Sequence, residues 1–115
     1  MTDHLNRSHH AQQPEAAPAH SRGRSPIRLA AAGVNQTPLA WETNRQNLVA
    51  AMDAARAAEA HVLCLPELCI SGYGCEDAFH SPGLSRTARQ LLEEIVPETR
   101  GLIVSIGLPV AYQNA

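Results

Sequence analysis

The segment HVLCLPELCISGYG, residues 61–74, passes from a short apolar run into a glycine-containing loop. Residues 61–65 are apolar enough to form a strand, and Pro66 ends that strand because proline has no N–H to donate to a sheet ladder. Residues 67–80 contain two glycines and no consistent hydrophobic period. We therefore predict a strand that ends at residue 65 and is followed mostly by loop.

Two further apolar runs flank this segment. Residues 27–34 (IRLAAAGV) are continuous rather than alternating, which is typical of a strand covered on both faces. Residues 102–110 (LIVSIGLPV) form the third expected strand.

Helical periodicity separates the three runs. The first helix is predicted by an apolar stripe at helical spacing, formed by Leu48, Ala51, Met52, Ala55 and Ala58. The second helix is predicted to begin with Ser81 as its N-cap and Pro82 at its first position, and to end or bend at Pro97. Its buried stripe is Leu84, Ala88, Leu91, Leu92 and Ile95. The order strand, helix, strand, helix, strand predicts an α/β fold.

The first 25 residues differ from the rest of the chain. They contain no Val, Ile or aromatic residue and hold four of the six histidines. Such a stretch buries too little apolar area to offset its ordering entropy, so we predict a disordered tail over residues 1–25. The domain is then expected over residues 26–115.

Charge and cysteine content limit the class of protein. Nine basic and eleven acidic residues give a net charge of -2, which argues against a nucleic-acid or anionic-membrane surface. No apolar run approaches the roughly 18 residues of a membrane span, and no hydrophobic N-terminal segment resembles a secretion signal. Three cysteines, an odd number, argue against a disulfide framework. We therefore expect a soluble, cytoplasmic protein.

Glu67 is the strongest candidate for chemistry, because sites in open α/β sheets lie beyond the carboxyl ends of the strands. Its neighbours Leu65, Pro66 and Leu68 are apolar. We therefore expect a partly desolvated carboxyl whose pKa is raised toward the range of a general base. From the residues alone, Glu67 is equally well interpreted as an exposed loop carboxylate or a helix-capping group.

Other chemistry-bearing residues are weaker candidates. Cys64, Cys69 and Cys75 have spacings that match no common zinc pattern, and Cys64 is expected to be a small hydrophobe buried in its strand. Residues 72–74 (GYG) lack the third glycine of a dinucleotide-binding loop, and no P-loop is present in the chain. We predict no metal or cofactor site in this chain.

Several motifs occur together in the order of a known family. They are VNQTPL at 34–39, Trp41, Glu42 and Asn44, LPELCISGYGCED at 65–77, ETRG at 98–101 and GLP at 107–109. In these motifs the chain resembles the carbon–nitrogen hydrolase (nitrilase) family, and within it the glutaminase domains of glutamine-dependent NAD synthetases. The resemblance covers residues 28–110. It implies part of the family's α-β-β-α sandwich, with the sheet face meant for the second sheet left exposed.

The resemblance also implies roles for two residues. The family uses a Glu–Lys–Cys triad, in which Glu67 matches the general base that accepts the cysteine proton, while Tyr73 matches an aromatic residue of the glutamine pocket. Glutamine hydrolysis through a thioester would supply ammonia for ATP-dependent amidation of deamido-NAD. ATP and Mg are thus implied for a further synthetase domain, and a homo-oligomer for the full-length protein.

The chain departs from the family pattern in its cations, because all nine basic residues are arginine and none is lysine. Arginine does not replace a catalytic lysine, because its planar fork suits a different geometry. The three cysteines lie too close to Glu67 in sequence to match the family nucleophile. The resemblance therefore implies a truncated domain, inactive by itself. Two alternatives stay open: a nitrilase-family amidase for another small amide, and a non-catalytic α/β interaction fragment.

Overall fold

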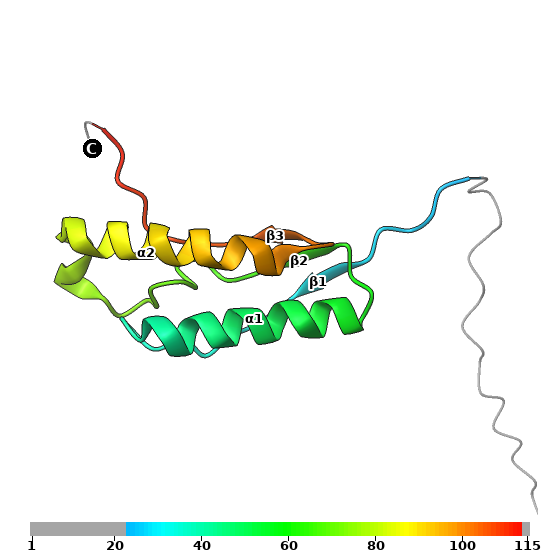
Figure 1. The fold of residues 1–115 in the computed structure, drawn as a ribbon, viewed down its shortest axis with the longest axis horizontal. Helices are drawn as coiled ribbons and strands as arrows, with labels where there is room; N and C mark the ends of the chain where they lie inside the picture. The colour runs from blue at the N-terminus through cyan, green and yellow to red at the C-terminus, as the bar shows by residue number, and fades with distance from the viewer. Residues whose placement is uncertain (1–22, 114–115) are drawn as a thin grey trace, which may run out of the picture.

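The computed structural model describes residues 23–113, so nearly all of the predicted tail, residues 1–25, lies outside the described part. The elements, in chain order, are β1 (Leu29–Ala31), α1 (Trp41–Ala57), β2 (Val62–Cys64), the 3-10 helix η1 (Glu76–His80), α2 (Pro82–Ile95), the 3-10 helix η2 (Val96–Thr99) and β3 (Ile103–Ser105). This order confirms the predicted alternation of strands and helices (Figure 1).

The three strands form one parallel sheet in the order β1-β2-β3. Leu63 of β2 pairs with Ala30 on one side and with Val104 on the other. Each strand is three residues long, so the apolar runs extend beyond the paired residues at both ends. An apolar run therefore indicates where a strand lies, but only residues that pair with the backbone of an adjacent strand belong to the sheet.

Both helices cover the same face of the sheet. Figure 1 shows α1 and α2 running side by side in one direction, opposite to that of the strands. The core between the layers contains Leu48 and Met52 of α1, Leu63 of β2, and Ala88 and Ile95 of α2, all at most 1% exposed.

The other face of the sheet is open. Leu29 and Ile103 are each 71% exposed, and both pair with Val62 in one row across the sheet. The prediction that β1 is covered on both faces is therefore wrong for this structure, because the helices pack only on the face that carries Ala30 and Val104. The open face implied by the family resemblance is confirmed.

The helix ends follow local signals. The Ser81 hydroxyl caps α2 by accepting a hydrogen bond from the Gly83 N–H at 3.3 Å, and Pro82 occupies the first turn, as predicted. The helix ends at Ile95, just before Pro97. In α1 the predicted stripe is correct except for Ala58, which is exposed because it lies beyond the helix end.

Within residues 23–113, no helix has the length and apolar character needed to cross a bilayer.

Candidate active site

Glu67 lies where predicted, just beyond the carboxyl end of β2, but its side chain is exposed. The expected desolvation is therefore wrong for this structure. Its apolar neighbours do not cover it, because Leu65, Cys69 and Ile70 are buried in the core beneath the helices. The carboxylate is left on the solvent side of a loop whose other side is packed.

The backbone around Glu67 is closely packed although the carboxylate is not. Leu68, the next residue, has a φ of 51°, a left-handed conformation that is uncommon for a non-glycine residue. Gly107, which follows β3, lies directly against this turn. A Cβ on Gly107 would be 2.6 Å from the Leu68 nitrogen and 2.7 Å from the Glu67 Cα. The position of Glu67 is thus set by a segment forty residues further along the chain.

Asn44 anchors the same loop from the side of α1. Its side chain is fully buried and accepts a hydrogen bond from the Thr37 N–H at 3.0 Å. Its amide group donates to the Thr37 carbonyl at 2.8 Å and to the Ile70 carbonyl at 3.1 Å. Asn44 was recognised in the sequence only as part of a motif, and this anchoring role was not predicted. The available signal was a polar residue four positions before Leu48, on the apolar stripe of α1.

The turn between β1 and α1 packs against the loop at two further points. The Gln36 amide donates to the Cys69 carbonyl, and the Leu39 N–H donates to the Ser71 carbonyl at 2.9 Å. Gly72 has a φ of 83°, and a Cβ there would lie 3.0 Å from the Pro38 Cα, so only glycine fits without strain.

Tyr73 follows Gly72 directly and is 57% exposed. Glu67 and Tyr73 are therefore carried by one anchored loop, and both side chains face solvent. No hydrogen bond joins the Glu67 side chain to Tyr73 or to another residue in the range 23–113.

The cysteines divide into one exposed and two buried residues. Cys64 is exposed, which corrects the prediction that it is buried: strand alternation directs Leu63 toward the helices and Cys64 toward the open face. Cys69 is buried, and this burial raises the pKa of its thiol. The Cys75 thiol donates to the Ser71 and Gly72 carbonyls, each at 3.3 Å. Neither of these two sulfur atoms is accessible from solvent.

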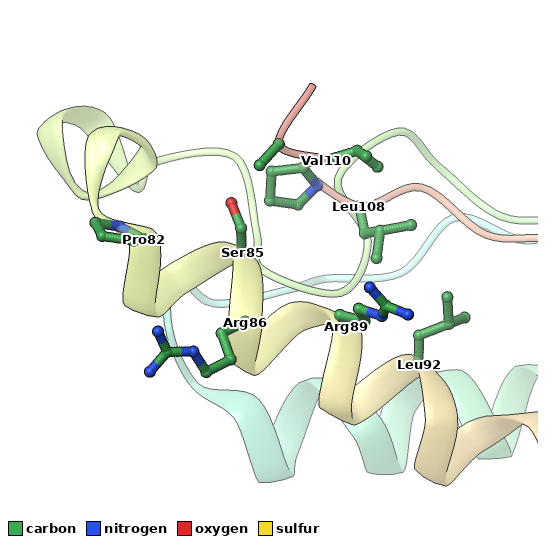
Figure 2. Close-up of a pocket in the computed structure, with 9 residues that line it drawn as sticks. Pro82, Ser85, Arg86, Arg89, Leu92, Leu108 and Val110 are labelled. Atoms are coloured by element: carbon green, nitrogen blue, oxygen red, sulfur yellow. The ribbon is translucent and has the colours of Figure 1, made fainter. Parts of the chain in front are cut away.

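A pocket of about 480 Å³ lies between α2 and the segment after β3. Figure 2 shows Ser85, Arg89 and Leu92 on α2 beside the segment that carries Leu108 and Val110. Glu67 and Tyr73 are not among its lining residues, so it is separate from the Glu67 loop. Across the described part of the chain, no group of three or more His, Cys, Asp or Glu residues could hold a metal ion.

Comparisons with known proteins agree on one family. A model of the carbon–nitrogen hydrolase family matches residues 28–114. Over 90 residues, the chain is 36% identical to a glutamine-dependent NAD(+) synthetase from Oryza sativa subsp. indica, covering 76% of this chain and 12% of that protein. It is equally identical over 90 residues to the Saccharomyces cerevisiae protein of that name, of which it covers 13%.

A solved structure gives the same result. The glutamine-dependent NAD(+) synthetase from Cytophaga hutchinsonii is 45% identical in sequence and superposes with a TM-score of 0.75, over 77% of this chain and 15% of that chain. The chain thus spans only 12–13% of the length of the curated relatives named above.

Proposed function

The chain belongs to the carbon–nitrogen hydrolase family, and on this premise we propose that it carries the general base of a glutamine-hydrolysing active site. The observation that supports this proposal most directly is the placement of Glu67. It follows the middle strand of the sheet, on a turn that packs against Gly107 and in a loop that Asn44 binds at Ile70. The names and the structural likeness of the relatives favour glutamine as the substrate.

In the proposed reaction, the Glu67 carboxylate accepts the proton of a cysteine thiol as its sulfur attacks the amide carbon of glutamine. The proton taken up by Glu67 passes to the amide nitrogen as the C–N bond breaks, so that ammonia leaves and the acyl group remains on the cysteine as a thioester. Water then attacks the thioester, and its proton returns to the cysteine sulfur as glutamate is released. Tyr73 contributes an aromatic wall to the glutamine pocket. The ammonia is consumed in the ATP-dependent amidation of deamido-NAD to NAD, so ATP and Mg bind to a domain outside this chain.

The lysine and the nucleophilic cysteine of this active site come from further polypeptide. The 115 residues contain no lysine, Cys69 and Cys75 are buried, and the exposed Cys64 lies too close to Glu67 in sequence to match the family nucleophile. Removing one electrostatic contact to the oxyanion costs about a hundredfold or more in rate. We therefore expect no glutamine hydrolysis from the 115-residue chain alone. The complete protein is proposed to be a cytoplasmic homo-oligomer.

A chimera tests the role of Glu67. Residues 28–113 of this chain replace the matching segment of the Cytophaga hutchinsonii synthetase, and NAD synthesis is measured with glutamine and, separately, with ammonia. Because the ammonia-dependent reaction bypasses the amidase step, Glu67→Gln should reduce glutamine-dependent synthesis about a hundredfold or more and leave ammonia-dependent synthesis unchanged.

The matched control is Glu93→Gln, which makes the same chemical change at an exposed ion pair on α2. This variant should retain both activities. The proposal is wrong if Glu67→Gln retains glutamine-dependent synthesis, or if the unsubstituted chimera makes NAD from ammonia but not from glutamine.

A further inference from the structure

Asn44 makes three of the four hydrogen bonds that its amide side chain can form, all of them inside the protein. One acceptor and two donors of its amide are engaged by Thr37 and Ile70, and the side chain has no exposed area. A buried amide is stable only while its partners stay in place, because an unpaired buried donor or acceptor costs free energy. Asn44 therefore constrains where Thr37 and Ile70 lie relative to each other.

Ile70 is held on both sides of its backbone. Its carbonyl accepts from Asn44 at 3.1 Å, and its N–H donates to the Gly107 carbonyl at 3.3 Å. Between Ile70 and Glu67 lie only Cys69 and Leu68. The Cys69 carbonyl is bonded to the Gln36 amide. The Leu68 carbonyl in turn accepts from the Gly72 N–H at 2.9 Å, so hydrogen bonds hold the loop directly after the turn that carries Glu67.

The turn itself needs such anchors. Leu68 has a φ of 51°, a left-handed conformation that is unfavourable for a non-glycine residue because its Cβ comes too close to the following carbonyl oxygen. A strained residue of this kind persists only where the surrounding contacts over-determine it. If the anchor on Ile70 is removed, Leu68 can relax to a negative φ, and this relaxation would turn the Glu67 side chain away from its present direction.

We propose that Asn44 is a positioning residue for Glu67: its buried amide holds Ile70 and thereby keeps the Glu67–Leu68 turn in its strained conformation. This inference rests on the proposed role of Glu67 as general base. Asn44 touches no reacting atom. It acts through the backbone of the loop, together with Gly107 on the opposite side.

The first test uses the 115-residue chain and needs no activity. Asn44→Asp keeps the acceptor for the Thr37 N–H but removes both donors, and it places a carboxylate oxygen near the Ile70 carbonyl. Hydrogen exchange of single amides is followed by NMR. We expect the Ile70 and Gly72 amides to exchange at least tenfold faster than in the unsubstituted chain, while the exchange of amides in the middle of α2 is unchanged.

The matched control is Gln46→Glu, the same amide-to-carboxylate change on the exposed side of α1. It should leave loop exchange unchanged. A purely structural role of Asn44 predicts that Asn44→Asp accelerates exchange in α2 as much as in the loop, and this result, or unchanged loop exchange, overturns the proposal.

The second test uses the chimera. Asn44→Asp should lower kcat for glutamine at least tenfold and leave ammonia-dependent synthesis unchanged, which shows that the protein is folded. In the Glu67→Gln background, Asn44→Asp should cause no further loss, because it acts only through Glu67. Additive losses overturn the positioning role. A chimera without glutamine-dependent activity contradicts the proposed function instead, and the exchange result still decides whether Asn44 holds the loop.

Discussion

Replacing Gly107 by alanine is expected to displace the turn that carries Glu67. The added methyl carbon would lie 2.6 Å from the Leu68 nitrogen, 2.7 Å from the Glu67 Cα and 2.8 Å from the Pro66 carbonyl oxygen. All three are backbone atoms, so no side-chain rotation can relieve the contact. Ordinary contact begins at 3.4 Å, so the two segments must separate by about 0.8 Å at the closest point.

This displacement sets the expected magnitudes. Forcing extra volume into a packed site costs typically about 1–3 kcal/mol, and we expect the free energy of unfolding to fall by that amount. A misplacement of about 1 Å at an active site can cost about a hundredfold in rate. In the chimera, Gly107→Ala should therefore lower glutamine-dependent synthesis by about ten- to a hundredfold and leave ammonia-dependent synthesis unchanged.

Urea denaturation of the 115-residue chain, followed by circular dichroism, measures the stability change. Gly33→Ala is the matched control, because a Cβ at Gly33 meets no atom within 4 Å and its φ is not positive. It should leave stability unchanged or raise it by up to about 1 kcal/mol. The reasoning is refuted if Gly107→Ala and Gly33→Ala unfold at the same urea concentration with the same slope.

Four further predictions concern the loop, the second helix and the thiols. Gly72→Ala should lower the free energy of unfolding by about 1–3 kcal/mol in the same urea assay, since its φ is 83° and the new Cβ would meet the Pro38 backbone at 3.0 Å. Ser81→Ala should cost about 1 kcal/mol through the lost N-cap of α2, whereas Ser81→Asp should retain most of the stability. Cys64 should react with a thiol reagent in the folded chain well before Cys69, and urea should remove the difference. Burial raises the pKa of the Cys69 thiol above its ordinary value of 9.0, so this thiol ionises at a lower pH in the unfolded chain than in the folded one. The free energy of unfolding should therefore fall as the pH rises past 9, and Cys69→Ala should reduce that fall.

Much of the fold could be predicted because its signals are local. Ser81 and Pro82 specify the start of α2 through a cap and a fixed φ, and both act within one turn of chain. Leu84, Leu91 and the rest of the α2 stripe follow a 3.6-residue period, which needs no knowledge of what covers them.

The anchors of the site could not be predicted in this way. Asn44 reaches Ile70 across 26 positions, and Gly107 meets Glu67 across forty. The place of Asn44 on the apolar stripe of α1 indicates burial but does not identify the carbonyl groups that its amide binds. The glycine likewise gives no sign of close approach, because its φ is not positive and no turn signature surrounds it.

The environment of Glu67 shows why apolar flanking residues are a poor guide to desolvation. Leu65 and Ile70 are buried, but they are buried toward the helices, because strand alternation and the turn at Leu68 direct them there. A side chain is desolvated by atoms that cover it in space. The residues next to Glu67 in sequence point from the same backbone toward the core, so they do not cover its carboxylate. What adjacent apolar residues do provide is rigidity: they bury one side of the loop and so let the backbone under Glu67 be fixed while the carboxylate stays accessible. In the role that we propose for Glu67, a general base that meets a thiol and a substrate, this segment contributes a fixed backbone. Desolvation would have to come from atoms that pack over the open side of the loop.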